Sequence, residues 1–186
     1  MADINSELLS RHRAPVDQRS GKTGTPNADP QLITFVELLF FAYRDFTREA
    51  DTILAEFGLG RAHHRVLHFV NRHPGLRVAD LLDILKITKQ SLARVLKELV
   101  DEGWIVQMAG ETDRRQRLLH ATDKGAALSS RLDAMQTRRV AQALEAAGGN
   151  QDVVARFLFA MITKEERAPV EMLLPGPVGA SASPRK

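Results

Sequence analysis

The chain has 186 residues, which suits one domain, and 44% of them are hydrophobic, which is enough for one core. It contains no cysteine, so disulfides, thiol-based redox sensing and zinc sites with cysteine ligands are excluded. The net charge of +3 is too small for indiscriminate binding of nucleic acid, so the local placement of lysine and arginine carries the information.

Residues 1–30 are rich in Arg, Ser, Gly and Pro and show no regular apolar spacing, which predicts a flexible N-terminal arm. Its arginines could touch phosphate, although a solvated tail is the simpler interpretation. The first residues lack the apolar core of a signal peptide. No apolar run approaches the ~18 residues of a membrane span. We therefore expect a cytoplasmic protein without a membrane partner.

Residues 31–58 are predicted to form a long helix whose first half is apolar over an unusually wide surface. One face can pack inside the subunit, and the rest needs another cover, because large apolar patches rarely stay exposed to water. A second copy of the chain is the economical cover, so we expect a homodimer. The aromatic side chains could instead line a small-molecule cavity, and the two interpretations are compatible. The apolar residues are Leu32, Phe35, Val36, Leu38, Leu39, Phe40, Phe41, Tyr43 and Phe46.

A second helix is predicted from Arg61 to His73, after two glycines and before Pro74-Gly75. Its histidines His64 and His68 lie four residues apart on one face, which is a spacing that zinc sites use. No third ligand follows nearby in the sequence, so we expect no metal and no cofactor. Hydrogen-bonded or interface histidines are the favoured interpretation, and contact with an effector is the second.

Two short helices separated by a tight turn are predicted next, which is the pattern of a helix-turn-helix. The first has apolar residues three and four apart, and the second, over residues 88–102, repeats this spacing. Between them lie Lys86, Ile87 and Thr88, and we expect Ile87 to enter the core and Thr88 to cap the second helix. The apolar residues are Val78, Leu81, Leu82 and Leu85 in the first helix, and Leu92, Val95, Leu96 and Leu99 in the second.

The other face of the second helix carries residues suited to duplex DNA. A cation such as Lys89 at a helix start opposes the helix dipole, and a phosphate partner would resolve that conflict. Glutamine can pair with adenine and arginine with guanine in the major groove, while small Ser91 permits close approach. An ordinary solvated helix face is the alternative. The candidate residues on this helix are Thr88, Lys89, Gln90, Ser91, Arg94 and Lys97.

A β-hairpin is predicted after Gly103, with strands at residues 104–108 and 117–121 and a turn at 109–116. An isolated hairpin is marginal in water, so we expect it to pack on the helices through Trp104, Ile105 and Leu118. Three arginines within four positions near the turn would repel one another. Beside DNA they would instead neutralise phosphates and release the counterions bound there, which favours binding. The arginines near the turn therefore predict contact with DNA. Asp113 can orient one of them through a charge-assisted hydrogen bond. The candidate residues are Asp113, Arg114, Arg115 and Arg117.

Two helices are predicted to end the ordered part. Thr122 can cap a helix that runs to Ala147, and a last apolar helix runs from Asn150 to about Arg167. Residues 169–186 are rich in Pro, Gly, Ser and Ala, which predicts a flexible C-terminal tail.

The segment resembles the multiple-antibiotic-resistance regulator (MarR) family of bacterial transcription factors. Residues 113–115 match that family's wing signature, Asp-any-Arg, and residues 120–125 match its Leu-Thr-any-any-Gly, with His-Ala in place of the apolar-Leu pair. The resemblance covers roughly residues 32–167. Residues 63–69 together with 89–92 are similar to one branch of the family, the PetP-like regulators.

The resemblance implies a mainly α fold: a winged helix-turn-helix at 60–121 with a two-stranded β-wing, inside a MarR-like domain at 31–168. Helices 31–58 and 122–168 would form the dimer. Gln90, Ser91 and Arg94 would face base edges, Lys89 and Lys97 would meet phosphate, and Arg115 would enter the minor groove. A repressor released by a small-molecule effector is implied, with the effector near Phe46, His64 and His68.

Three other functions would require different sequence features. A winged helix used for protein–protein contact would expose an apolar helix face, whereas this face is cationic. An architectural DNA-binding protein would share the cationic face and lack sequence preference. An enzyme is not expected, because the sequence offers no nucleophile-elbow glycines, no cysteine and no metal-binding constellation.

Overall fold

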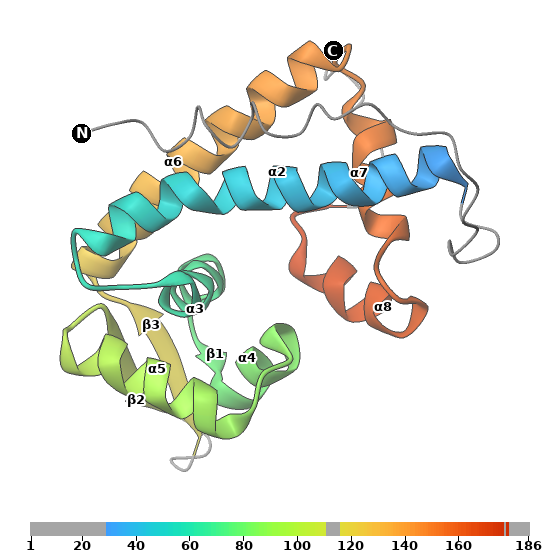
Figure 1. Cartoon of the computed structure of the whole chain (residues 1–186). Helices are drawn as coiled ribbons and strands as arrows, with labels where there is room; N and C mark the ends of the chain where they lie inside the picture. Colours follow the sequence, from blue (N-terminus) through green and yellow to red (C-terminus); the bar gives the residue numbers. More distant parts are fainter. Residues whose placement is uncertain (1–28, 111–115, 177, 179–186) are drawn as a thin grey trace, which may run out of the picture. The chain divides into compact units, whose positions relative to one another are not determined.

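The computed structural model describes residues 29–110, 116–176 and 178. By their contacts the residues divide into two units, Met1–Leu39 and Phe40–Lys186. In the first unit, helix α2 (Pro30–Ala55) begins where Asp29 Oδ1 accepts a hydrogen bond from the Gln31 amide at 2.9 Å. The second unit holds the remainder of α2 and all the other elements described below (Figure 1).

The helix-turn-helix forms where it was predicted. Helix α3 (Arg61–Arg72) is followed by α4 (Val78–Leu85) and α5 (Lys89–Asp101), and these three helices pack on one another and on the sheet. Lys86 adopts the left-handed conformation, with φ 50°, which turns the chain sharply after α4. Ile87 is partly buried against the core, and Thr88 Oγ1 accepts from the Ser91 amide at 3.1 Å. Both the predicted turn and the predicted cap are confirmed.

The hairpin consists of β2 (Ile105–Ala109) and β3 (Arg117–Ala121), and a short strand that was not predicted, β1 (Leu76–Arg77), pairs with the other edge of β3. The prediction that Leu118 anchors the hairpin is wrong. Leu119 is fully buried and Leu118 is only half-buried, because the register that pairs Ile105 with Ala121 puts odd-numbered side chains of β3 on the core face.

Helix α6 (Asp123–Ala146) begins at the predicted cap, where Thr122 Oγ1 accepts from the Gly125 amide at 3.1 Å. The same threonine donates its amide to the carbonyl of Trp104 at 3.1 Å. Its hydroxyl donates to the carbonyl of Gly103 at 2.7 Å and lies 3.2 Å from that of Trp104. Trp104 is buried, with Phe57 packed edge-on at 5.3 Å and Lys124 Nζ 3.7 Å from the centre of its ring. This junction joins the hairpin to α6.

The core of the second unit lies between α3, α5, the sheet and the first half of α6. Fully buried side chains come from each of these elements, and also from the end of α2 and from α4. They are Leu54, Val66, Leu67, Val70, Leu81, Leu92, Leu99, Ile105, Leu119 and Leu132. Among the helices in the described ranges, none combines the length and the apolar character needed to span a bilayer.

The predicted last helix, Asn150 to about Arg167, is wrong in its extent. It is divided into α7 (Gln151–Ala160) and α8 (Lys164–Leu173), so that residues 169–173, expected in the tail, are helical. The break at 161–163 is stabilised by Arg167, which donates to the carbonyls of Ala160 at 2.6 Å and Ile162 at 3.0 Å. These carbonyls lie at the end of α7, where a helix lacks internal partners.

Gly125→Ala tests the junction between Trp104 and α6. Helix propensity alone predicts that alanine stabilises the fold by up to about 1 kcal/mol. A Cβ at this position would lie 2.1 Å from the Trp104 carbonyl oxygen and 3.2 Å from Leu67 Cδ1, and Thr122 holds that carbonyl in place. We therefore expect the free energy of unfolding in urea to fall by about 2–3 kcal/mol.

Ala127→Gly, at an exposed position of the same helix, is the control. Only propensity acts there, and the expected cost is about 1 kcal/mol. A Gly125→Ala variant as stable as the wild type would contradict the close contact.

Candidate nucleic-acid interface

Helix α5 buries one apolar stripe and exposes the candidate polar residues. Leu92, Val95, Leu96 and Leu99 are all buried, as predicted. The six candidate residues of residues 88–97 are all exposed, namely Thr88, Lys89, Gln90, Ser91, Arg94 and Lys97. The burial of one stripe therefore turns every candidate side chain of this helix towards solvent.

The first turn of α5 is tightly organised. Besides capping the helix, Thr88 donates from its hydroxyl to Ser91 Oγ at 2.8 Å. The two hydroxyl groups thus hold each other, and the Ser91 hydroxyl keeps its own hydrogen for an outside acceptor. Lys89 has no ion-pair partner among the residues that the structure describes. Its charge at the positive end of the helix dipole is available to an anion.

The other two cations of α5 are paired with acids one turn further along the helix. Arg94 Nε lies 3.7 Å from Glu98 Oε1, and Lys97 Nζ is hydrogen-bonded to Asp101 Oδ2. The bond to Asp101 raises the pKa of Lys97 above its usual value. Surface pairs of this kind contribute little to stability and can be exchanged for phosphate. The pairing was not predicted, although the spacing of four residues is visible in the sequence.

Glu98 has a second partner that sequence reasoning missed. His63 Nε2 of α3 lies 2.6 Å from Glu98 Oε2, and the His63 side chain is only 14% exposed. Part of this arrangement could have been predicted, because His63 lies three residues after Gly60, the N-cap of α3. A side chain at that position can accept a hydrogen bond from the N-cap amide. Its contact with α5 depends on packing between helices and is not visible in the sequence.

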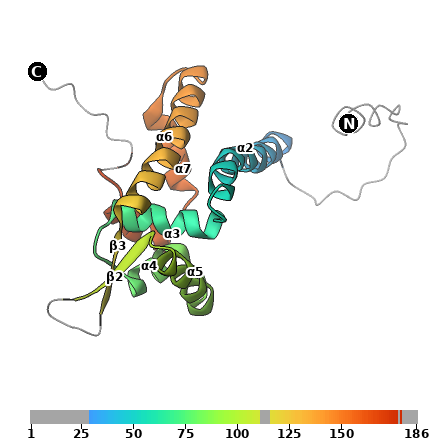
Figure 2. The same cartoon turned by 90° about the vertical axis from the view of Figure 1, so that its left-hand side faces the viewer.

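The hairpin projects beyond the helices, as Figure 2 shows. In both views it lies with α5 at the same end of the second unit, away from the C-terminal end of α6. Arg117 is exposed at the start of β3. The candidates Asp113, Arg114 and Arg115 lie outside the described residues. The structure thus brings Arg117 and the face of α5 to one end of the unit.

The proposed effector residues lie on two elements. His64 and His68 pack edge to face on α3, with ring centres 6.4 Å apart, and His68 Nδ1 lies 3.1 Å from Asp133 Oδ1 of α6. Burial, and then the nearby His68, lower the pKa of His64, while Asp133 and Asp51 act in the opposite direction. Within the described residues, no group of three or more His, Asp or Glu side chains could hold a metal ion.

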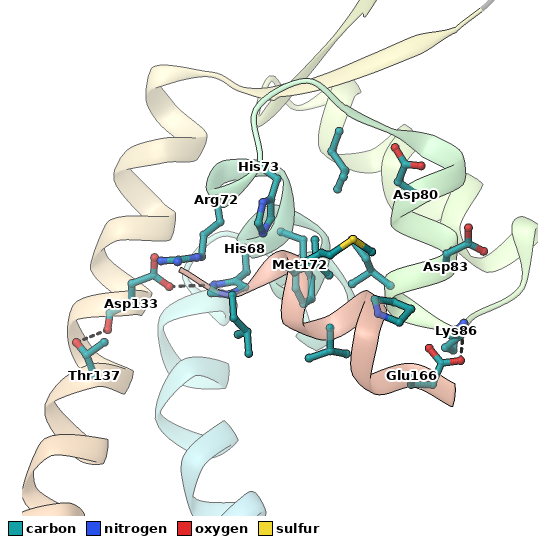
Figure 3. A pocket seen from close by; sticks show the side chains of 17 residues that line it. His68, Arg72, His73, Asp80, Asp83, Lys86, Asp133, Thr137, Glu166 and Met172 are labelled. Carbon is teal, nitrogen blue, oxygen red and sulfur yellow. Dashed lines mark hydrogen bonds and ion pairs between the residues drawn. The ribbon is translucent and has the colours of Figure 1, made fainter. Parts of the chain in front are cut away.

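A cavity of about 1000 Å³ opens beside His68 (Figure 3). Its walls come from α3, α4, α6 and α8 and combine charged residues with an apolar surface from α8. His68 is among the lining residues, and neither Phe46 nor His64 is. Lys86, at the turn before α5, lies 3.1 Å from Glu166 of α8 and joins the cavity wall to the helix-turn-helix. The wall residues contributed by α8 and the residue that follows it are Glu166, Pro169, Val170, Met172, Leu173 and Leu174.

Comparison with solved structures supports the fold. A SlyA-like transcription regulator from Listeria monocytogenes is 20% identical, with a TM-score of 0.55 over 79% of this chain and 92% of that one. A MarR transcriptional regulator from Methanosarcina mazei Go1 is 22% identical, with a TM-score of 0.51 over 75% of this chain and 90% of that one. At these identities the likeness concerns the fold alone.

Comparison of sequences goes further. The model of the MarR family matches residues 57–116, which contain the helix-turn-helix and the first strand of the hairpin. The HTH-type transcriptional regulator PetP of Rhodobacter capsulatus is 46% identical over 148 residues, which are 78% of this chain and 88% of that protein. Regulators of the MarR family bind DNA and are not enzymes. Through this relative and the matching family model, the chain belongs to the MarR family of transcriptional regulators.

Proposed function

We propose that the protein is a homodimeric, sequence-specific regulator that binds a palindromic operator through residues 88–102 and the wing at 109–117. The observation that carries the proposal is the face of α5, where four apolar side chains are buried and every candidate DNA-binding side chain is exposed. A helix of this kind fits the major groove when its polar side chains reach base edges.

The roles within this interface follow from the chemistry of each side chain. Gln90, Ser91 and Arg94 contact base edges, and Lys89 and Lys97 contact phosphate. Lys89 favours an anion because it lies at the first turn of α5 without an ion-pair partner in the described part of the chain. Arg115, for which the family resemblance is the only argument, enters the adjacent minor groove.

The dimer is supported by the exposed apolar side chains outside the helix-turn-helix and the hairpin. In the second unit Phe40 is 70% exposed and Leu158 is 53% exposed, with Phe41, Tyr43 and Met161 also more than half exposed. A second copy of the chain would remove this apolar area from water. A two-fold dimer imposes its own symmetry on the operator, so half-site centres should lie about 10 base pairs apart.

Control by a small molecule completes the proposal. An effector bound near Phe46, His64 and His68 would release a repressor if it favoured a dimer whose lobe spacing does not fit the operator. The cavity beside His68 offers space for such a ligand at one of these three residues. The ion pair between Lys86 and Glu166 connects its wall with the turn before α5. A regulator of chromosomal genes in a bacterium would act in the cytoplasm.

Two alternatives have different consequences. A protein-interaction module would not need the three cations Lys89, Arg94 and Lys97 on its exposed helix. An architectural protein would bind all duplexes alike, so the comparison between a selected duplex and a scrambled one distinguishes it from a specific regulator.

Arg94→Ala and Arg115→Ala should each abolish selective binding while leaving the dimer intact, because both remove contacts inside the grooves. Fluorescence anisotropy would compare a duplex selected by the wild-type protein from a random-sequence library with a scrambled duplex. For Arg94, losing one arginine–guanine contact in the major groove is worth roughly 5- to 150-fold in discrimination. Lys97→Ala is the contrast, since it should weaken all duplexes alike and reduce the salt slope by about one. Wild-type discrimination in both arginine variants would refute the interface.

Phe40→Asp and Leu158→Asp should convert a dimer into a monomer, because each places a charge in the apolar surface that the second copy covers. Sedimentation equilibrium of the full chain measures the change directly. Val106→Asp serves as the control, since Val106 is also exposed, at 43%, but lies on the hairpin. A wild-type protein that remains monomeric at every concentration would exclude the homodimer.

His64→Gln should make stability less dependent on pH. The pKa of His64 in the folded chain lies below the ordinary value of 6.5, so the unfolded chain takes up the proton more readily. The free energy of unfolding of the wild type should therefore fall as the pH drops from about 7 to about 5. Urea unfolding at several pH values should give a smaller slope for the variant, which has no group to protonate there. Equal slopes would contradict the buried, neutral His64.

A further inference from the structure

Glu98 connects a partly buried histidine to the exposed face of α5. It lies one helical turn after Arg94 on α5, and His63 of α3 reaches it across the packed helices with Nε2 2.6 Å from Glu98 Oε2. The other acid on the exposed side of α5, Asp101, pairs with Lys97 and has no such anchor among the described residues. Glu98 is therefore the acid of α5 that a contact with another helix holds in place.

Both ring nitrogens of His63 are engaged. Nδ1 accepts a hydrogen bond from the Gly60 amide at 3.0 Å, so a neutral ring carries its hydrogen on Nε2 and donates it to Glu98. Gly60 is the N-cap of α3, and His63 occupies the position from which a side chain closes the first turn. Rotation of the His63 ring would break both hydrogen bonds at once. The two bonds therefore fix the orientation of the ring that donates to Glu98.

The second oxygen of Glu98 faces the arginine. Glu98 Oε1 lies 3.7 Å from Arg94 Nε, and the Arg94 side chain is 82% exposed. A glutamate on an open helix surface would adopt many rotamers, only some of which pair with the arginine. It would therefore restrict the conformations of the arginine side chain little. With one oxygen held by His63, the other presents a fixed anion to the guanidinium group. Fewer arrangements of Arg94 are then lost when it binds a base.

We propose that Glu98, held by His63, is a positioning residue that orients Arg94 for base recognition. The proposal rests on the proposed function, in which Arg94 reads a base. A carboxylate close to DNA opposes binding to any duplex, because it repels the phosphates. The contribution of Glu98 therefore lies in discrimination between sequences and not in overall affinity. A side chain that only stabilised α5 would affect both affinities together.

The experiment measures the full chain on three kinds of probe: the duplex selected from a random-sequence library, its single-base-pair variants, and a scrambled duplex. Glu98→Gln should bind the scrambled duplex about two- to fivefold more tightly, because one negative charge is lost. Discrimination at the base pair read by Arg94 should fall roughly three- to tenfold, and discrimination elsewhere should be unchanged. His63→Gln should lower the same discrimination without the gain in scrambled affinity. A glutamine at this position can still accept from the Gly60 amide.

Asp101→Asn is the matched control, since it removes the same charge from the same helix at a residue that His63 does not hold. It should strengthen binding to the selected and scrambled duplexes alike and leave their ratio unchanged. In the double variant Arg94→Ala/Glu98→Gln, discrimination should equal that of Arg94→Ala alone, because Glu98 acts through Arg94. Thermal unfolding of each variant checks that the fold is retained.

The outcomes separate the two proposals. If Arg94→Ala leaves discrimination unchanged at every base pair, the assignment of Arg94 to base recognition fails. If Arg94→Ala lowers discrimination while Glu98→Gln and His63→Gln both retain the wild-type ratio, positioning by Glu98 is overturned. An additional loss of discrimination in the double variant would overturn it as well.

Discussion

The burial of four apolar side chains of α5 is the interaction on which the proposed recognition surface depends. Leu92, Val95, Leu96 and Leu99 are nearly inaccessible, and together they remove enough apolar area from water to fix the rotation of the helix. Once that rotation is set, the opposite side chains must face outward, whatever they are. Cations can therefore be concentrated there at small cost to the fold, because none of them is buried.

Buried contacts also anchor the junction between the hairpin and α6. Trp104 supplies a carbonyl that accepts from the Thr122 amide and an indole that packs with Phe57 and Lys124. Gly125 is required because the approach of α6 to that carbonyl leaves no room for a Cβ. A hairpin that would be marginal alone thus gains a packed base.

Local patterns in the sequence were sufficient for the helix-turn-helix, its cap at Thr88 and the cap at Thr122, since each depends on neighbours within four residues. They were insufficient where distant residues decide. The register of the hairpin puts Leu119 and not Leu118 in the core, and Arg167 stabilises a break in a helix that looks continuous by apolar spacing. The exposed face of α5 was predictable as a set of residues, whereas the contact between His63 and Glu98 was not, because 35 residues separate the two partners.

The acids on the proposed recognition face would affect how such a surface selects sequences. Unpaired cations would attract every duplex equally, since phosphate charge carries no sequence information. Pairing Arg94 with Glu98 and Lys97 with Asp101 lowers that general attraction before DNA arrives. Within the proposed function, this neutralisation lowers the affinity for correct and incorrect sites alike. The ratio between them increases only where an acid also fixes the side chain that reads a base, as proposed for Glu98 and Arg94. That ratio is the quantity that matters to a regulator facing a whole genome.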